Sequence, residues 1–211
     1  MTGLTTLLAL ADSRLPTGGH VHSGGVEEAV TSGRVLDLAT LRAFLRRRIS
    51  TQGLVTASIA AAVHARSLSF AAADRETDAR TPAPAARLAS RAQGRGLARL
   101  ARRVWPADDW DALGATPHLA VAAGAVGAAS GMPSLHTALS VVYTTMTGSA
   151  TAAQRLLALD PGDVAALTFE LSALCDQTAE LACKELADLS DPLLDVLAQR
   201  HSERERPLFA S

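Results

Sequence analysis

The chain has 211 residues, of which 48% are hydrophobic, and its formal net charge is −1 at pH 7. This length is enough for one domain with a sizeable core, and the near-neutral charge gives no reason to expect a nucleic-acid or membrane partner. Aromatic residues contribute only 3%, so the core must be built from Ala, Leu and Val, whose side chains suit closely packed helices. We therefore predict an all-α, single-domain multi-helix bundle over residues 1–211.

Three features favour a cytoplasmic, reduced setting. No basic segment precedes an apolar stretch at the N-terminus, so no signal peptide is expected. The most apolar run, Leu119 to Met132, is shorter than the roughly 20 residues that span a bilayer. On one helix, Cys175 and Cys183 would lie about 12 Å apart, beyond the roughly 7 Å limit for a disulfide.

Helical spacing of apolar residues predicts a nearly all-helical chain. Pro117, Pro133 and Pro161 each stand where a helix should begin. A bend or break is expected at Gly53, and no helix is predicted over the charged segment 74–80. The expected helices are 5–11, 25–32, one that starts at a cap on Asp37 or Thr40 and runs through Ile49, 54–63, 85–104, 118–130, 134–158, 162–189, and a short helix at the start of a flexible tail, 191–211.

The segment 15–27 is a glycine-rich loop with the sequence LPTGGHVHSGGVE. Its glycines could suggest a phosphate-binding loop, but no strand precedes it and Lys184 is the only lysine of the chain. His20 and His22 are weak candidates for a metal site, because a closed zinc site normally needs four ligands. We favour a structural role for both histidines by about 3:1, since no carboxylate or cysteine accompanies them at a fixed spacing.

Five arginines recur at every fourth position between Arg87 and Arg103 and would form a slowly drifting stripe on one helix. Such a stripe could bind phosphates or an acidic protein surface, or it could be a solvated helix face. The two interpretations are about equally favoured, because like charges at this spacing cost a little helix stability. No arrangement of nucleophile and base, nor paired carboxylates, indicates an active site.

Several dispersed motifs, in order along nearly the whole chain, resemble the UreF family of urease accessory proteins. The His20-Val21-His22 centre resembles the actinobacterial type. It is also a departure from the family pattern, because many other members carry Phe-Ser-Tyr or Phe-Ser-His at this position. A second departure is the segment 158–161, where many members carry Pro-Leu-Gly-Gln. The matching motifs are Leu10–Ser13, Leu15–Gly19, Ser23–Glu27, the central Ser90–Arg95, Pro117–Val121, Ala152–Leu156, Pro192–Asp195, and the pairs Arg200-His201 and Leu208-Phe209.

The resemblance implies a helical scaffold and not an enzyme. Such proteins join the UreD/UreH accessory protein and the GTPase UreG on apo-urease, so that nickel is inserted into the urease active site, and they tend to form homodimers. The resemblance also implies that no cofactor is stably bound: nickel is handled by the complex, and GTP by the partner GTPase.

Thirteen residues are candidates for partner binding. The loop would face a partner or a second copy, the arginines would contact the GTPase, and the tail would become ordered on UreD/UreH. The candidates are Pro16, Gly18, Gly19, Ser23, Gly25, Glu27, Arg91, Arg95, Arg155, Pro192, Asp195, His201 and Phe209. Two alternatives stay open: a helical nucleic-acid-binding regulator that uses the Arg87–Arg103 stripe, and a nickel carrier that uses His20 and His22.

Overall fold

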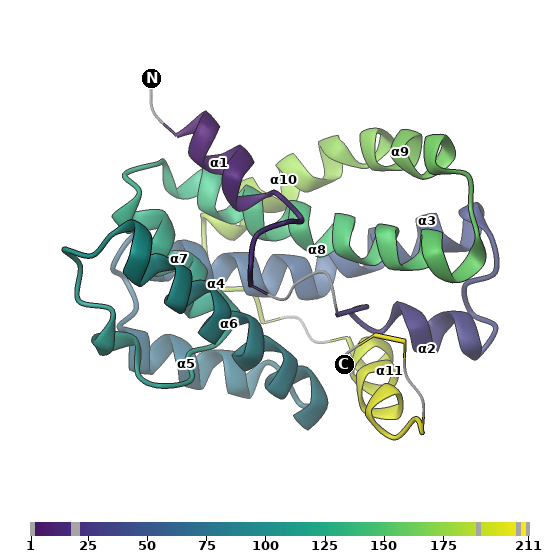
Figure 1. The fold of residues 1–211 in the computed structure, drawn as a ribbon, viewed down its shortest axis with the longest axis horizontal. Coiled ribbons are helices and arrows are strands. Elements are labelled where there is room, and N and C mark those ends of the chain that lie inside the picture. Colours follow the sequence, from purple (N-terminus) through teal and green to yellow (C-terminus); the bar gives the residue numbers. More distant parts are fainter. Residues whose placement is uncertain (1–2, 18–21, 189–190, 206–207, 210–211) are drawn as a thin grey trace.

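The computed structural model describes residues 3–17, 22–188, 191–205, 208 and 209. These residues form helices joined by short turns, with no strand among them, so the all-α prediction is confirmed. The α-helices are α1 (Leu4–Leu10), α2 (Val26–Thr31), α3 (Leu38–Arg48), α4 (Leu54–His64), α5 (Phe70–Ala79), α6 (Pro84–Val104), α7 (Leu119–Ala129), α8 (Ser134–Leu157), α9 (Pro161–Glu170), α10 (Ser172–Ala182) and α11 (Pro192–Ser202) (Figure 1).

The predicted start signals lie at the observed helix starts. Asp37 caps α3, and Thr40 bonds back to the Asp37 amide, which completes a capping box. Pro161 occupies the first turn of α9, after an Asp160 side chain that accepts from the Gly162 amide at 2.7 Å. Pro133 directly precedes α8. Capping side chains at α3 and α9, and prolines at α8 and α9, therefore mark where these helices begin.

Two expected boundaries are wrong. The stretch 162–189 is not one helix, because α9 ends at Glu170 and α10 runs only to Ala182. The chain turns at Leu171, which is completely buried, so packing against the rest of the protein sets this corner. The charged segment 74–80 is mostly helical, since α5 extends to Ala79.

At Gly53, where a bend or break is predicted, the chain stays helical. A π-helical turn, η2 (Ile49–Gly53), joins α3 to α4. Such turns carry one extra residue and often kink the helix that contains them. Arg48 and Gln52 flank this turn, and the Arg48 guanidinium donates to the Gln52 amide oxygen at 2.6 Å.

The core is centred on α4, which packs against α7, α8 and α10. Small residues let these helices approach closely: Ala57 and Ala60 of α4 are fully buried. A Cβ atom at Gly124 of α7 would lie 2.5 Å from the Ala60 carbonyl oxygen. The low aromatic content is therefore matched by short interhelical distances.

The C-terminal part of the chain returns to its N-terminal part. Helix α11 packs against α2 and α6, and α1 lies on α8 (Figure 1). None of the described helices combines the length and the apolar character needed to cross a membrane. The two ends of the sequence that carry the predicted loop and tail therefore lie close to one another and to the central arginine-rich helix.

Candidate functional site

Glu27 joins the glycine-rich loop to the C-terminal tail. Its side chain, in the first turn of α2, is buried to 2% exposure and accepts from His201 Nε2 at 2.6 Å. The same carboxylate accepts from the backbone amides of Leu208 at 2.8 Å and Phe209 at 3.0 Å. Three of the predicted partner-binding residues are thus brought together at one carboxylate. We call the surface formed by α2, α11 and residues 203–205, 208 and 209 the loop–tail junction.

The junction favours an ionised carboxylate. Burial raises the pKa of Glu27, but the two backbone amides and His201 outweigh it and leave the pKa below its ordinary value. An ion pair between Arg204 Nη1 and Glu28 at 3.0 Å lies beside this carboxylate. A charge-assisted set of this kind holds the tail more firmly than neutral hydrogen bonds would.

Gly24 and Gly25 allow the close approach that the junction needs. Both have positive φ, 62° and 85°, a conformation that side chains rarely adopt. A Cβ at Gly25 would also lie 3.4 Å from the Leu197 Cβ of α11. Ser23, the neighbouring loop candidate, is completely buried, and its carbonyl accepts from Ser149 Oγ at 3.2 Å. The loop candidates Ser23 and Gly25 are both buried, so they fix the shape of the loop from inside the protein.

The start of α11 is anchored to two other elements. Asp191 caps the helix and forms two hydrogen bonds with Arg47, at 2.5 and 2.8 Å. Asp195 accepts from the Ala83 amide at 3.4 Å, and burial raises its pKa. Pro192 is exposed in the first turn. Of the predicted tail residues here, only Pro192 is open to a partner without rearrangement.

The arginines of α6 differ in their surroundings. Arg91 is embedded among acidic groups: it pairs with Asp74 at 2.9 Å and Asp78 at 2.8 Å, and donates to the Thr116 carbonyl. Arg95, one turn later, is exposed. The Arg87–Arg103 stripe is therefore interrupted by an arginine that already has protein partners.

His118 completes the cluster around Arg91. Its ring is fully buried, with Nε2 2.9 Å from Asp78 and Nδ1 3.0 Å from Ser90 Oγ. Burial of the ring is the largest influence on the pKa of His118 and lowers it below its ordinary value. The ligand atoms of Asp74, Asp78 and His118 lie close enough together to hold a metal ion. However, the Arg91 guanidinium pairs with both carboxylates, so a cation of the protein already lies beside them and offsets part of their charge.

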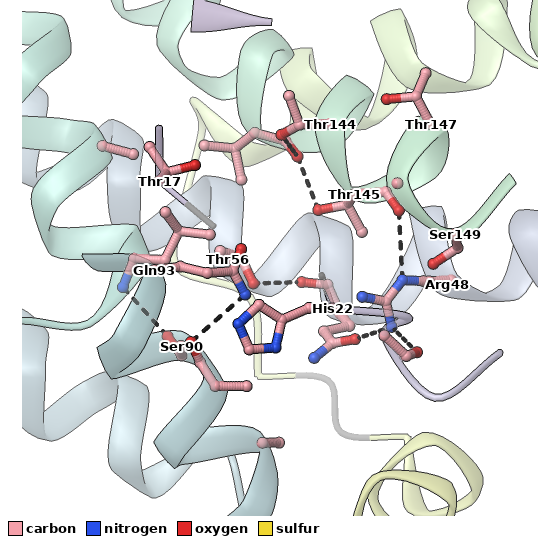
Figure 2. Close-up of a pocket in the computed structure, with 18 of the residues that line it drawn as sticks. Thr17, His22, Arg48, Thr56, Ser90, Gln93, Thr144, Thr145, Thr147 and Ser149 are labelled. Atoms are coloured by element: carbon pink, nitrogen blue, oxygen red, sulfur yellow. Dashed lines mark hydrogen bonds between the residues drawn. The ribbon is translucent and has the colours of Figure 1, made fainter. Parts of the chain in front are cut away.

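A cavity of about 590 Å³ lies between the loop, α3, α4, α6, α8 and α11. His22 and Arg48 are among the residues that line it (Figure 2), and Arg155 lines it as well. Arg155, a predicted partner contact, is exposed in the last turn of α8, and Pro16 is exposed in the loop. The predicted candidates Gly18, Gly19 and His20 lie outside the described residues.

Sequence reasoning missed the arginines Arg47 and Arg48 and the Asp74–Asp78 pair. The i,i+4 spacing of the two aspartates was the available signal, because it places both carboxylates on one face of a helix. Nothing in the sequence indicates that Arg91, thirteen residues after Asp78, would lie against that face. The partner of Arg47 is 144 positions away.

Comparison with known proteins places the chain in a family. The UreF family model matches residues 35–172. The urease accessory protein UreF of Mycobacterium sp. (strain JLS) is 81% identical over 211 residues, and that of Mycolicibacterium vanbaalenii is 79% identical over 214 residues. The UreF of Mycobacterium tuberculosis (strain H37Rv) is 69% identical over 211 residues. Each comparison covers 100% of both chains. The chain therefore belongs to the UreF family.

Proposed function

We propose that this protein is a scaffold in urease maturation. It joins the UreD/UreH accessory protein and the GTPase UreG on apo-urease, and the assembly inserts nickel into the urease active site. The observation that carries this proposal is the 81% identity to a urease accessory protein UreF over the full length of both chains. In this role the chain binds other proteins and performs no catalysis. Nickel is handled by the complex and GTP by the GTPase, so no cofactor is stably bound here.

The loop–tail junction is the proposed surface for UreD/UreH. Its outer side carries apolar groups that a lone protein would be expected to bury: Leu208 is 79% exposed and Val196 of α11 is 46% exposed. The inner side is fixed by Glu27 and His201. A rigid base under an exposed apolar edge is a suitable arrangement for a protein interface.

Arg95 and Arg155 are the proposed contacts for the GTPase. Both are exposed, and neither forms an ion pair within the described part of the chain. Arg91, one turn before Arg95 on α6, is held by its carboxylate partners Asp74 and Asp78. Guanidinium groups of this kind suit acidic protein surfaces and phosphates.

A second apolar face supports a homodimer. Leu4 and Leu8 of α1 are 67% and 70% exposed, and α1 packs on α8, whose Leu135 and Tyr143 are 40% and 41% exposed. The positions 135 and 143 are eight residues apart and so lie on one side of the helix. We propose that a second copy covers this face.

Co-purification tests the assembly. The intact protein should capture both UreD/UreH and UreG, and urease made without it should lack nickel. Leu208→Ser should lose UreD/UreH. The matched control is Phe169→Ser on α9, which removes an apolar side chain that is also 79% exposed. Capture of neither partner by the intact protein, together with normal nickel content in urease made without it, would overturn the proposal.

A further inference from the structure

Arg48 is held at the wall of the cavity by an unusual backbone. It is the last residue of α3, and the π turn η2 follows it. π turns are rare and occur frequently at functional sites. Here the turn places Gln52 where its amide oxygen accepts from Arg48 Nη1 at 2.6 Å. Both residues line the cavity, and Figure 2 shows Arg48 in its wall.

The charge of Arg48 has no acidic partner. Its three hydrogen-bond acceptors are neutral: the Gly24 carbonyl at 2.6 Å, the Gln52 side chain, and the Thr145 carbonyl at 3.4 Å. No carboxylate of the described residues lies within ion-pair distance of it, although Arg47 and Arg80 are each paired. Burial lowers the pKa of Arg48 to about 10, so the group remains charged at neutral pH.

Arg48 is half-buried, and a cation that is partly removed from water is stabilised by a counter-charge nearby. The orientation of the guanidinium leaves a position for such a counter-charge. Nη1 and Nε are used by the three carbonyl-type oxygens, whereas Nη2 donates to no described residue. Because these acceptors hold the guanidinium in one orientation, a ligand at Nη2 would not have to order it first.

The remaining wall of the cavity favours an anion. Ser90 and Gln93 of α6 present polar side chains to the cavity, whereas the Thr56 and Thr144 hydroxyls donate to backbone carbonyls one turn earlier in the chain (Figure 2). Arg155 adds a second cation without an ion pair in the described residues. Three carboxylates line the cavity, and two of them are already neutralised: Asp12 by Arg14 and Asp191 by Arg47. The third, Asp195, lies on α11 and accepts from the Ala83 amide.

We infer that this cavity binds a small free oxyanion, of the phosphate or carboxylate type, with Arg48 as its charged donor. The inference goes beyond scaffold assembly, since it concerns a ligand inside this chain and needs no partner protein. The cavity volume of about 590 Å³ is within the range of small-molecule sites. The anion would neutralise Arg48, which, like Arg155, has no counter-charge at contact distance among the described residues.

Titration of the full chain with sodium phosphate tests the inference, with sodium chloride at matched ionic strength as the blank. Amide NMR shifts or calorimetry should show saturable binding, and Arg48→Gln should weaken it at least about tenfold, as expected for loss of a charged hydrogen bond. Arg99→Gln is the control, because it removes an exposed arginine of α6 that does not line this cavity. A parallel titration with sodium acetate shows whether carboxylates are also accepted.

Two isosteric substitutions at Gly148 give a second test of anion binding, which still holds if Arg48→Gln does not fold. It lines the cavity one turn beyond Thr144, and a Cβ there would meet nothing within 4 Å. Gly148→Asp places a negative charge in the cavity and should weaken phosphate binding several-fold relative to Gly148→Asn. The inference is overturned if neither phosphate nor acetate shows saturable binding. It is also overturned if a folded Arg48→Gln, or the Asp variant, binds as tightly as its control.

Discussion

The contact between α4 and α7 gives a sharp test of how this core is packed. In Gly124→Ala, the new Cβ would lie 2.5 Å from the Ala60 carbonyl oxygen and 2.6 Å from the Val63 Cβ. Ordinary contacts are about 3.5–4.0 Å, so the helices would have to separate by about 1 Å. Overpacking of this kind costs up to about 3 kcal/mol, and the better helix propensity of Ala returns about 1 kcal/mol. We expect a net loss of about 2 kcal/mol in the free energy of unfolding.

Gly148→Ala is the matched control, because a Cβ at Gly148 of α8 meets nothing within 4 Å. Only the propensity gain applies there, so this variant should be more stable than the parent by about 0.5–1 kcal/mol. Urea unfolding followed by far-UV circular dichroism measures both changes, with an unchanged denaturant slope as the sign that only stability has moved. The reasoning is refuted if Gly124→Ala is as stable as Gly148→Ala, because helix propensity alone would then explain both variants.

Three further results follow from the loop–tail junction and from α6. Glu27→Gln should lower the free energy of unfolding by about 2–3 kcal/mol and speed hydrogen exchange at Leu208 and Phe209, whose amides it holds; unchanged exchange there would contradict the assigned role. Because the pKa of Glu27 is below its ordinary value near 4.5, its contribution to stability is complete above about pH 4.5 and is lost as the pH falls through the lower folded value. A pH series of unfolding midpoints should therefore fall less steeply in acid for Glu27→Gln than for the parent, and parallel curves would contradict this. Arg91→Gln should cost about 1–3 kcal/mol in chemical unfolding through its lost charged hydrogen bonds, whereas Arg95→Gln should stay within about 0.5 kcal/mol; equal effects of the two substitutions would show that the carboxylate cluster does not hold Arg91.

Helix starts could be predicted from the sequence where neighbouring residues determine them. Prolines and an Asp cap fix the starts of α3, α8 and α9, because they act on the residues next to them. The corner at Leu171 has no such signal, since neither Gly nor Pro lies there. It arises because the buried face of α10 turns onto α4 and α8, a tertiary effect that overrides a continuous helical pattern.

The sequence named candidate residues but could not show which of them meet in the fold. Glu27, His201 and Phe209 come from opposite ends of the chain and meet at one carboxylate. Only the three-dimensional fold can show that meeting. Arg91 and Arg95 look alike in sequence, yet one is paired with Asp74 and Asp78 and the other is exposed. The difference depends on the position of α5, which the sequence pattern did not identify as a helix up to Ala79.

The loop–tail junction and the cavity share a wall, so a change at one should be felt at the other. The Gly24 carbonyl oxygen accepts a hydrogen bond from Arg48 Nη1, and the next residue, Gly25, packs against Leu197 of α11. Phe209 of the tail also lines the cavity. A partner that moves the tail would therefore alter the wall on which Arg48 is held. Because coupling of this kind is reciprocal, an anion at Arg48 would change partner affinity by the same factor as the partner changes anion affinity. Phosphate titrations in the presence and absence of UreD/UreH measure that factor, and equal affinities would show that the two surfaces are independent.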